Sequence, residues 1–93
     1  MDDKTRRLAA IMEQAEHAHA AISQKTGGAD AEWPLFYSWW LLEWSELPEA
    51  LGTTPPRSEL IFELILADRD YRAGSQAARW SEFYAERLVA RWP

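Results

Sequence analysis

The sequence predicts an all-α protein, a compact up-and-down bundle of three to four helices with one short extra helical turn. Apolar residues recur at three- and four-residue spacings in several stretches, and no stretch alternates long enough to indicate a strand. Gly or Pro residues mark short connections between these stretches, which favours antiparallel neighbours. Because 93 residues are enough for one domain and too few for two, we expect residues 1–93 to form a single helical domain.

The first helix is expected from about Asp3 to Lys25, a segment rich in strong helix formers such as Ala, Glu, Gln and Arg. Its apolar residues follow the spacing of an amphipathic helix, and they are Leu8, Ile11, Met12, Ala15, Ala18 and Ile22. The residues Thr26, Gly27 and Gly28 are expected to end this helix, because glycine readily adopts the left-handed conformation that follows a helix.

The second helix is expected to begin after Asp30, a candidate cap, to hold Pro34 in its first turn and to end near Glu46. At about 100° per residue it is apolar on two opposite faces. One face carries Trp33, Phe36, Tyr37, Trp40, Trp44 and Leu47, and the other carries Leu35, Trp39 and Leu42. Residues 47–52 predict a short extra turn that Gly52 closes.

The third helix is expected from about Pro56 to Arg72, with Thr54 or Ser58 as its cap. The fourth is expected from a cap at Ser75 to about Arg91. Their apolar faces are defined by Leu60, Ile61, Leu64, Ile65 and Tyr71, and by Ala77, Trp80, Phe83, Tyr84 and Leu88. Six Trp, three Tyr and three Phe can build a large core for so short a chain, because each ring buries roughly 150–250 Å².

Composition excludes several classes of function. The net charge of −5 repels nucleic acid and anionic lipid, so we expect no nucleic-acid partner. The absence of cysteine excludes thiolate metal sites and cysteine nucleophiles. The longest apolar run, residues 33–42, is shorter than the roughly 20 residues of a membrane-spanning helix, and the polar first seven residues do not resemble a signal peptide. We therefore expect a cytoplasmic protein with no membrane association.

Glu16 and His19 are the candidate metal ligands, because their Glu-x-x-His spacing is the one that di-metal helix bundles use. Such a centre needs a second inward His on another helix, and His17, the other histidine of the chain, projects to the opposite side. We therefore expect no bound metal and no cofactor. The structural alternative is that His19 is a partly buried side chain hydrogen-bonded to a neighbour.

Two charged residues fall on the apolar faces of the last two helices. Asp68 lies in the middle of the third helix face and Arg87 lies within the fourth helix face. Because an unpaired buried charge is costly, we expect the two to form a buried ion pair that fixes the register of the helices. The functional alternative is a small polar pocket rimmed by Trp and Tyr.

Two functional hypotheses follow. The first is a non-catalytic interaction or oligomerisation module that docks a second copy or another protein through Leu35, Trp39 and Leu42. The second is a small ligand-binding or metal-binding enzyme with a site between helices near His19, Asp68 and Arg87. A flat apolar patch around Trp39 would favour the first hypothesis, and a concave, aromatic-lined pocket with polar residues would favour the second.

Overall fold

A computed structural model describes residues 2–26 and 32–93 of the chain. Its helices are α1 (Asp3–Thr26), α2 (Trp33–Glu43), α3 (Leu47–Leu51), α4 (Arg57–Ala73) and α5 (Trp80–Arg91). The structure is 78% helix, and the described residues contain no strand, so the prediction of an all-α fold is confirmed. The four longer helices and the short α3 correspond in order to the helices and the extra turn expected from the sequence.

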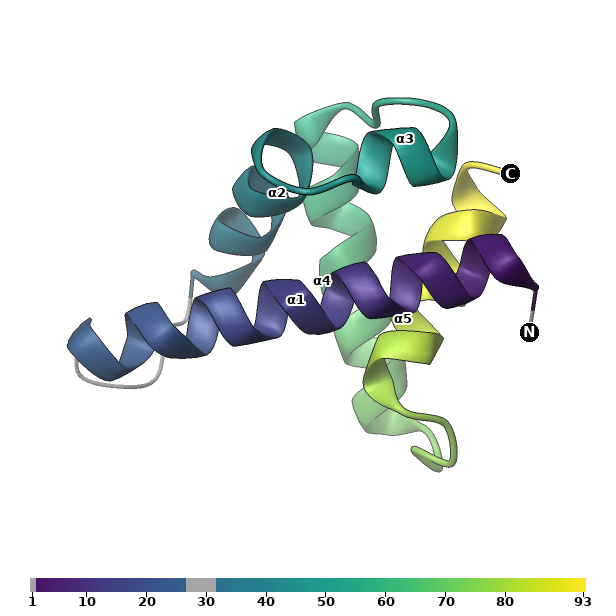
Figure 1. Ribbon diagram of the computed structural model, residues 1–93. Coiled ribbons are helices and arrows are strands. Elements are labelled where there is room, and N and C mark those ends of the chain that lie inside the picture. Colours follow the sequence, from purple (N-terminus) through teal and green to yellow (C-terminus); the bar gives the residue numbers. More distant parts are fainter. Residues whose placement is uncertain (1, 27–31) are drawn as a thin grey trace.

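The helix α1 runs across the molecule and packs against α5, α2 and α3 (Figure 1). Behind it, α4 and α5 lie side by side and run in opposite directions, while α2 and the short α3 lie above α1 in this view, and α2 also packs against α4. The most extensive contact between any two helices joins α1 to α5, the first and last elements of the chain. This contact closes the bundle.

Leucine dominates the core. The side chains buried most completely are Leu8, Met12, Leu41, Leu47, Leu60, Leu64 and Leu88. None of the six tryptophans is fully buried: four pack partly against the core, and two are exposed. The expectation of a core built on aromatic rings is therefore wrong for tryptophan, because closely packed helices leave room for aliphatic side chains at their crossings and for indoles only at the margin.

The inner face of α2 differs from the predicted one. Its buried residues are Tyr37, Ser38 and Leu41, whereas Trp44, which we expected on the inner face, is 68% exposed. The reason is that α2 ends at Glu43, three residues earlier than predicted. Trp44 therefore lies where the chain leaves the helix and is not held against the core.

The predicted helix caps are only partly correct. Gly52 ends α3 in the left-handed conformation, with φ of 83°, as expected. The cap of α4 is Pro56 and not Thr54 or Ser58, and it makes no side-chain hydrogen bond. Nor is Ser75 the cap of α5, which begins five residues later, at Trp80. The predicted cap Asp30 and the predicted stop at residues 27–28 lie outside the described residues.

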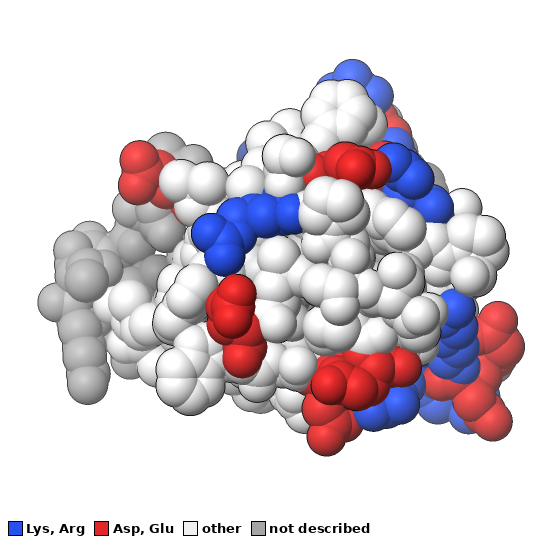
Figure 2. Space-filling view, turned by 90° about the horizontal axis from the view of Figure 1, so that it is seen from above, with Lys and Arg blue, Asp and Glu red and all other residues white. Residues whose placement is uncertain are grey.

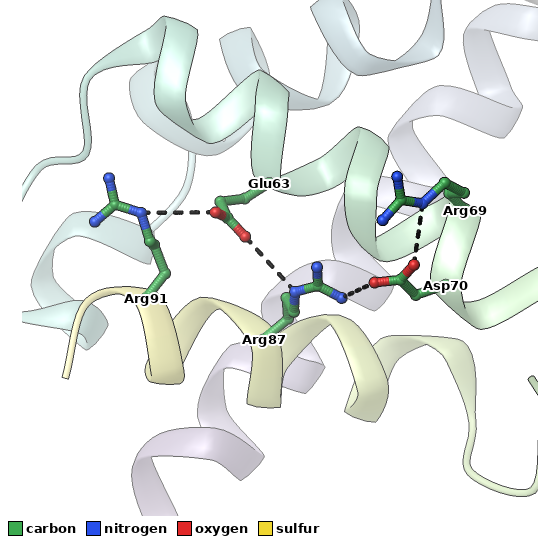
Figure 3. A network of polar contacts seen from close by, with 5 residues as sticks. All are labelled: Glu63, Arg69, Asp70, Arg87 and Arg91. Atoms are coloured by element: carbon green, nitrogen blue, oxygen red, sulfur yellow. Dashed lines mark hydrogen bonds and ion pairs between the residues drawn. The ribbon is translucent and has the colours of Figure 1, made fainter.

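Ion pairs join α4 to α5 along one side (Figure 3). Arg87 contacts Asp70 at 2.7 Å (Nη1 to Oδ2) and Glu63 at 3.6 Å (Nε to Oε2). Arg91, one turn further along α5, contacts Glu63 at 3.6 Å (Nε to Oε1). The hydrogen bond from Arg87, and then the one from Arg69, hold the pKa of the Asp70 carboxyl below its usual range. Glu63 is the more buried carboxylate, with a side chain 12% exposed.

The predicted pair between Asp68 and Arg87 is replaced by these contacts. Two residues along an α-helix correspond to about 200° of rotation, so Asp68 lies roughly 160° around α4 from Asp70. Seven residues correspond to nearly two full turns, so Asp70 and Glu63 lie on the same side, next to Arg87. Ion pairs therefore do join α4 to α5, but the carboxylates that form them are Glu63 and Asp70, and not Asp68.

Replacing Arg87 by Met is expected to lower the free energy of unfolding by about 1–2 kcal/mol, because Glu63 remains mostly buried with only Arg91 nearby. In urea denaturation, a double-mutant cycle of Glu63→Gln and Arg87→Met should show favourable coupling. The matched cycle of Asp68→Asn and Arg87→Met should show none. Coupling confined to the second cycle would contradict the observed network.

Candidate functional site

A pocket of about 370 Å³ opens between the four longer helices. Aromatic rings and charged groups line it together. From the first two helices come Glu16 and His19 of α1 and Trp33 and Tyr37 of α2. From the second half of the chain come Asp68, Tyr71 and Arg72 of α4, Gln76 of the connection, and Trp80 and Tyr84 of α5. The structure thus brings together three residues that the sequence singled out, Glu16, His19 and Asp68, while Arg87 is not part of the lining.

Four of the aromatic residues come from a short repeated pattern in the sequence. Trp-x-x-Phe-Tyr occurs at Trp33–Tyr37, where α2 begins, and again at Trp80–Tyr84, where α5 begins. Because Trp and Tyr are four residues apart, each pair lies on one side of its helix. In both copies the rings of the pair meet edge to face, with centroids 5.4 Å apart in α2 and 5.5 Å apart in α5. Two matching aromatic walls therefore line the pocket.

The sequence predicts a polar pocket rimmed by Trp and Tyr only as an alternative to core packing, and it does not identify which of these residues form the walls. The signal that could have found them is the Trp-x-x-Phe-Tyr pattern itself, which occurs twice in 93 residues. The phenylalanine of each copy packs on a further residue of the lining. Phe36 packs on His19 and Phe83 packs on Tyr71, with ring centroids 5.2 Å and 5.3 Å apart. Both phenylalanines thus support a neighbouring residue of the lining.

Asp68 is held in the pocket by two donors. The Nε atom of Arg72 donates to its Oδ1 at 3.0 Å, and the Tyr84 hydroxyl donates to the same oxygen at 3.3 Å. Its side chain is 29% exposed, so the carboxylate is partly shielded from solvent. The cation that balances its charge is therefore Arg72, four residues along the same helix, in place of the expected Arg87.

Of the three tyrosines that line the pocket, Tyr37 and Tyr84 are buried. Burial, and then the nearby negative charge of Glu16, raise the pKa of the Tyr37 hydroxyl to about 12. Burial raises the pKa of the Tyr84 hydroxyl as well, and the charge of Asp68 and the hydrogen bond to it add to this. Both phenols therefore stay protonated and uncharged at neutral pH.

Tyr37 differs from Tyr84 in its hydrogen bonding. Its side chain is only 8% exposed, yet its hydroxyl has no hydrogen-bond partner among the described residues. Within those residues no fully buried polar side-chain atom lacks a partner, so the hydroxyl must reach the open space of the pocket. Tyr37 thus offers the pocket one unused donor and acceptor.

Gln76 has a backbone conformation that non-glycine residues rarely adopt. Its φ is 57°, in the left-handed region, which costs roughly 1–2 kcal/mol for a residue with a side chain. It lies in the connection between α4 and α5, where the Tyr71 hydroxyl donates to the carbonyl of Ala78 at 2.7 Å. This contact ties the connection to the end of α4, and the strained residue lies at the edge of the pocket.

The candidate metal ligands lie in the pocket but do not form a ligand cluster. The described residues contain no group of three or more His, Cys, Asp or Glu side chains that could hold a metal ion. His19 instead packs its ring on Phe36 and on Tyr37, with centroids 5.2 Å and 5.4 Å apart. The position of His19 is thus set by aromatic packing.

The second apolar face of α2 is largely uncovered. Leu35 is 53% exposed and Trp39 is 42% exposed, while Leu42 packs partly against the core. Trp39 contacts the rings of Phe36 and Trp44, with centroids 5.8 Å and 6.0 Å apart. Seen from above, charged side chains interrupt the uncharged area of the face that carries α2 and α3 (Figure 2). The exposed ion pair between Arg57 and Glu43 lies beside Trp39 and Trp44.

No protein family, curated protein or solved structure matches this chain. In the described part of the chain, no helix combines the length and the apolar character that crossing a membrane requires.

Stability at alkaline pH tests the environment of Tyr37. The ordinary pKa of 10.0 applies to the unfolded chain and about 12 to the folded one. Its stabilising contribution is therefore complete below pH 10 and is lost as the pH rises toward 12. For this one group we expect a loss on the order of 2 kcal/mol, measured by urea denaturation at increasing pH. Tyr37→Phe should flatten the dependence, and an unchanged slope would contradict this assignment.

Proposed function

We propose that the protein is a small-ligand-binding module whose site is the pocket between α1, α2, α4 and α5. The observation that carries this proposal is the Tyr37 hydroxyl, which belongs to a buried side chain, faces the pocket and has no partner among the described residues. Because this hydroxyl reaches the open space of the pocket, it is accessible to a hydrogen bond with a molecule that enters there.

The size and composition of the pocket support this proposal. Its volume of about 370 Å³ is within the range of roughly 300–1,000 Å³ that is usual for small-molecule sites. Such sites are walled by apolar and aromatic side chains and hold a few polar groups that orient the ligand. Here the walls are the two Trp–Tyr pairs, and the orienting groups are the Tyr37 hydroxyl and the carboxylates of Glu16 and Asp68.

The way in which the fold builds the pocket supports the same function. Trp33 and Trp80 are the first residues of their helices and are only partly buried. Four helices from both halves of the chain supply the lining, and α1 packs against both α2 and α5. The helices that carry the walls are therefore held together by the bundle itself.

A small-molecule fragment screen tests this function, with the tryptophan indole N–H signals observed by proton–nitrogen NMR. We expect hits to shift the signals of Trp33 and Trp80 and to leave that of Trp44 in place. Trp80→Ala should weaken these hits about tenfold or more, because one aromatic wall is lost. The control Trp44→Ala, which removes an exposed indole outside the pocket, should leave them unchanged. Hits that cluster on Trp39 and Trp44 would count against the pocket.

The exposed face of α2 favours a second candidate function, docking of another copy of this chain. Leu35, Trp39 and Trp44 are all exposed, and the rings of Trp39 and Trp44 touch. Exposed apolar clusters of this kind mark partner surfaces, and tryptophan is enriched among the residues that contribute most to binding. The chain carries a net charge of −5, so two copies meet best on uncharged residues such as Leu35, Trp39 and Trp44. We propose a cytoplasmic location for the protein under either function.

Sedimentation over a range of concentrations tests this docking. If Trp39 anchors a homodimer, Trp39→Ala should weaken association by more than about 2 kcal/mol, roughly thirtyfold in dissociation constant. Trp92→Ala serves as the control, since it removes a partly buried indole at the other end of the chain. A wild-type protein that stays monomeric at high concentration would remove the support for docking and leave the pocket proposal intact.

A further inference from the structure

The pocket has an uncompensated negative charge. Of its two carboxylates, Asp68 is paired with Arg72 and accepts a hydrogen bond from Tyr84. Glu16, at the rim, forms no ion pair or hydrogen bond with any of the described residues. Since Arg72 is the one Lys or Arg side chain in the lining and already contacts Asp68, the charge of Glu16 is left over.

The faces of the aromatic rings in the walls favour positive charge. The face of an aromatic ring is the negative end of its quadrupole, and it draws cations, most strongly where the ring is an indole. The lining contains the indoles of Trp33 and Trp80 and the phenol rings of Tyr37, Tyr71 and Tyr84. Tyrosine is uncharged at neutral pH, and burial raises the pKa of the Tyr37 and Tyr84 hydroxyls further, so these phenols add neutral rings and no further anions. Aromatic faces beside one free carboxylate are complementary to a cation.

The same groups argue against other ligand classes. An inorganic metal ion would need several ligand atoms close together, and the described residues offer no group of three. An anion would meet the free charge of Glu16, and the guanidinium available to it is already engaged by Asp68. Over longer distances the net charge of −5 draws cations toward the protein and repels anions.

We propose that the pocket between α1, α2, α4 and α5 binds an organic ammonium ion, with its apolar groups against the indoles of Trp33 and Trp80 and its charge near Glu16. The hydroxyl of Tyr37, which has no partner among the described residues, supplies a hydrogen bond to a polar group elsewhere on the same ligand. This inference rests on the proposed ligand-binding function and adds the chemical class of the ligand.

Three probes of nearly the same shape and different charge test the ligand class. The first is choline, the second is its uncharged isostere with a tert-butyl group in place of the trimethylammonium group, and the third is the tert-butylacetate anion. Each is titrated into the full chain while the indole signals of Trp33 and Trp80 are followed by NMR. We expect choline to bind at least about tenfold more tightly than the other two probes, from cation–π attraction and the charge of Glu16 together.

Variants identify the source of the preference. Glu16→Gln should weaken choline binding about two- to fivefold, as expected for a solvent-exposed ion pair, and should leave the uncharged isostere unaffected. Glu86→Gln, which removes the same charge from an exposed position on α5 outside the pocket, should change neither. A uniform loss of all three probes in Glu16→Gln would contradict the assigned charge pairing.

The outcomes separate this inference from the function on which it rests. If the uncharged isostere or the anion binds as tightly as choline at the same indoles, the ammonium class is wrong and the pocket remains a ligand site. If none of the three probes shifts the pocket indoles, the ammonium class is likewise wrong, and the fragment screen decides the function independently. Choline that shifts only Trp39 or Trp44 would also overturn the inference.

Discussion

The close packing of α1 against α5 determines where large side chains can lie in this protein. On α5 the residues buried beneath α1 include Ser81 and Ala85, which are small, and α1 contributes Ala15 to the same core. The Ser81 hydroxyl donates to Glu13 of α1 at 3.0 Å, which fixes the contact with a hydrogen bond. Helices that approach on small and aliphatic residues leave no space for an indole between them. The tryptophans are therefore placed at the edges of the core.

This displacement produces both candidate sites. On the side where α2 and α5 begin, the Trp and Tyr rings of the Trp-x-x-Phe-Tyr pattern line the pocket. On the outer side of α2, the displaced rings of Trp39 and Trp44 lie exposed. A small helical domain with many aromatic residues and a leucine core thus acquires apolar surface in two forms, one concave and one convex.

The helices could be predicted from the sequence because their signals are local. Spacing of apolar residues, helix-forming composition and the glycines and prolines between segments place all five elements, with errors at the ends of α2 and α5. The site could be predicted only in part, because it depends on how helices rotate against one another. The sequence places Asp68 on an inner face, and the structure agrees. The partners of Arg87 depend on the rotation of α4, which places Asp70 and Glu63 next to Arg87.

The unusual composition of α2 is consistent with its position between the two candidate sites. A helix that is apolar on all sides is normally buried on all sides, and α2 is not. Its inner edge presents Trp33 and Tyr37 to the pocket, and its outer edge presents Leu35 and Trp39 to solvent. Ring contacts connect the two edges, because Phe36 packs on both His19 and Trp39. Although these rings touch, each edge of α2 presents its own apolar surface, one to the pocket and one to solvent. The ligand-binding proposal and the docking proposal can therefore succeed or fail separately.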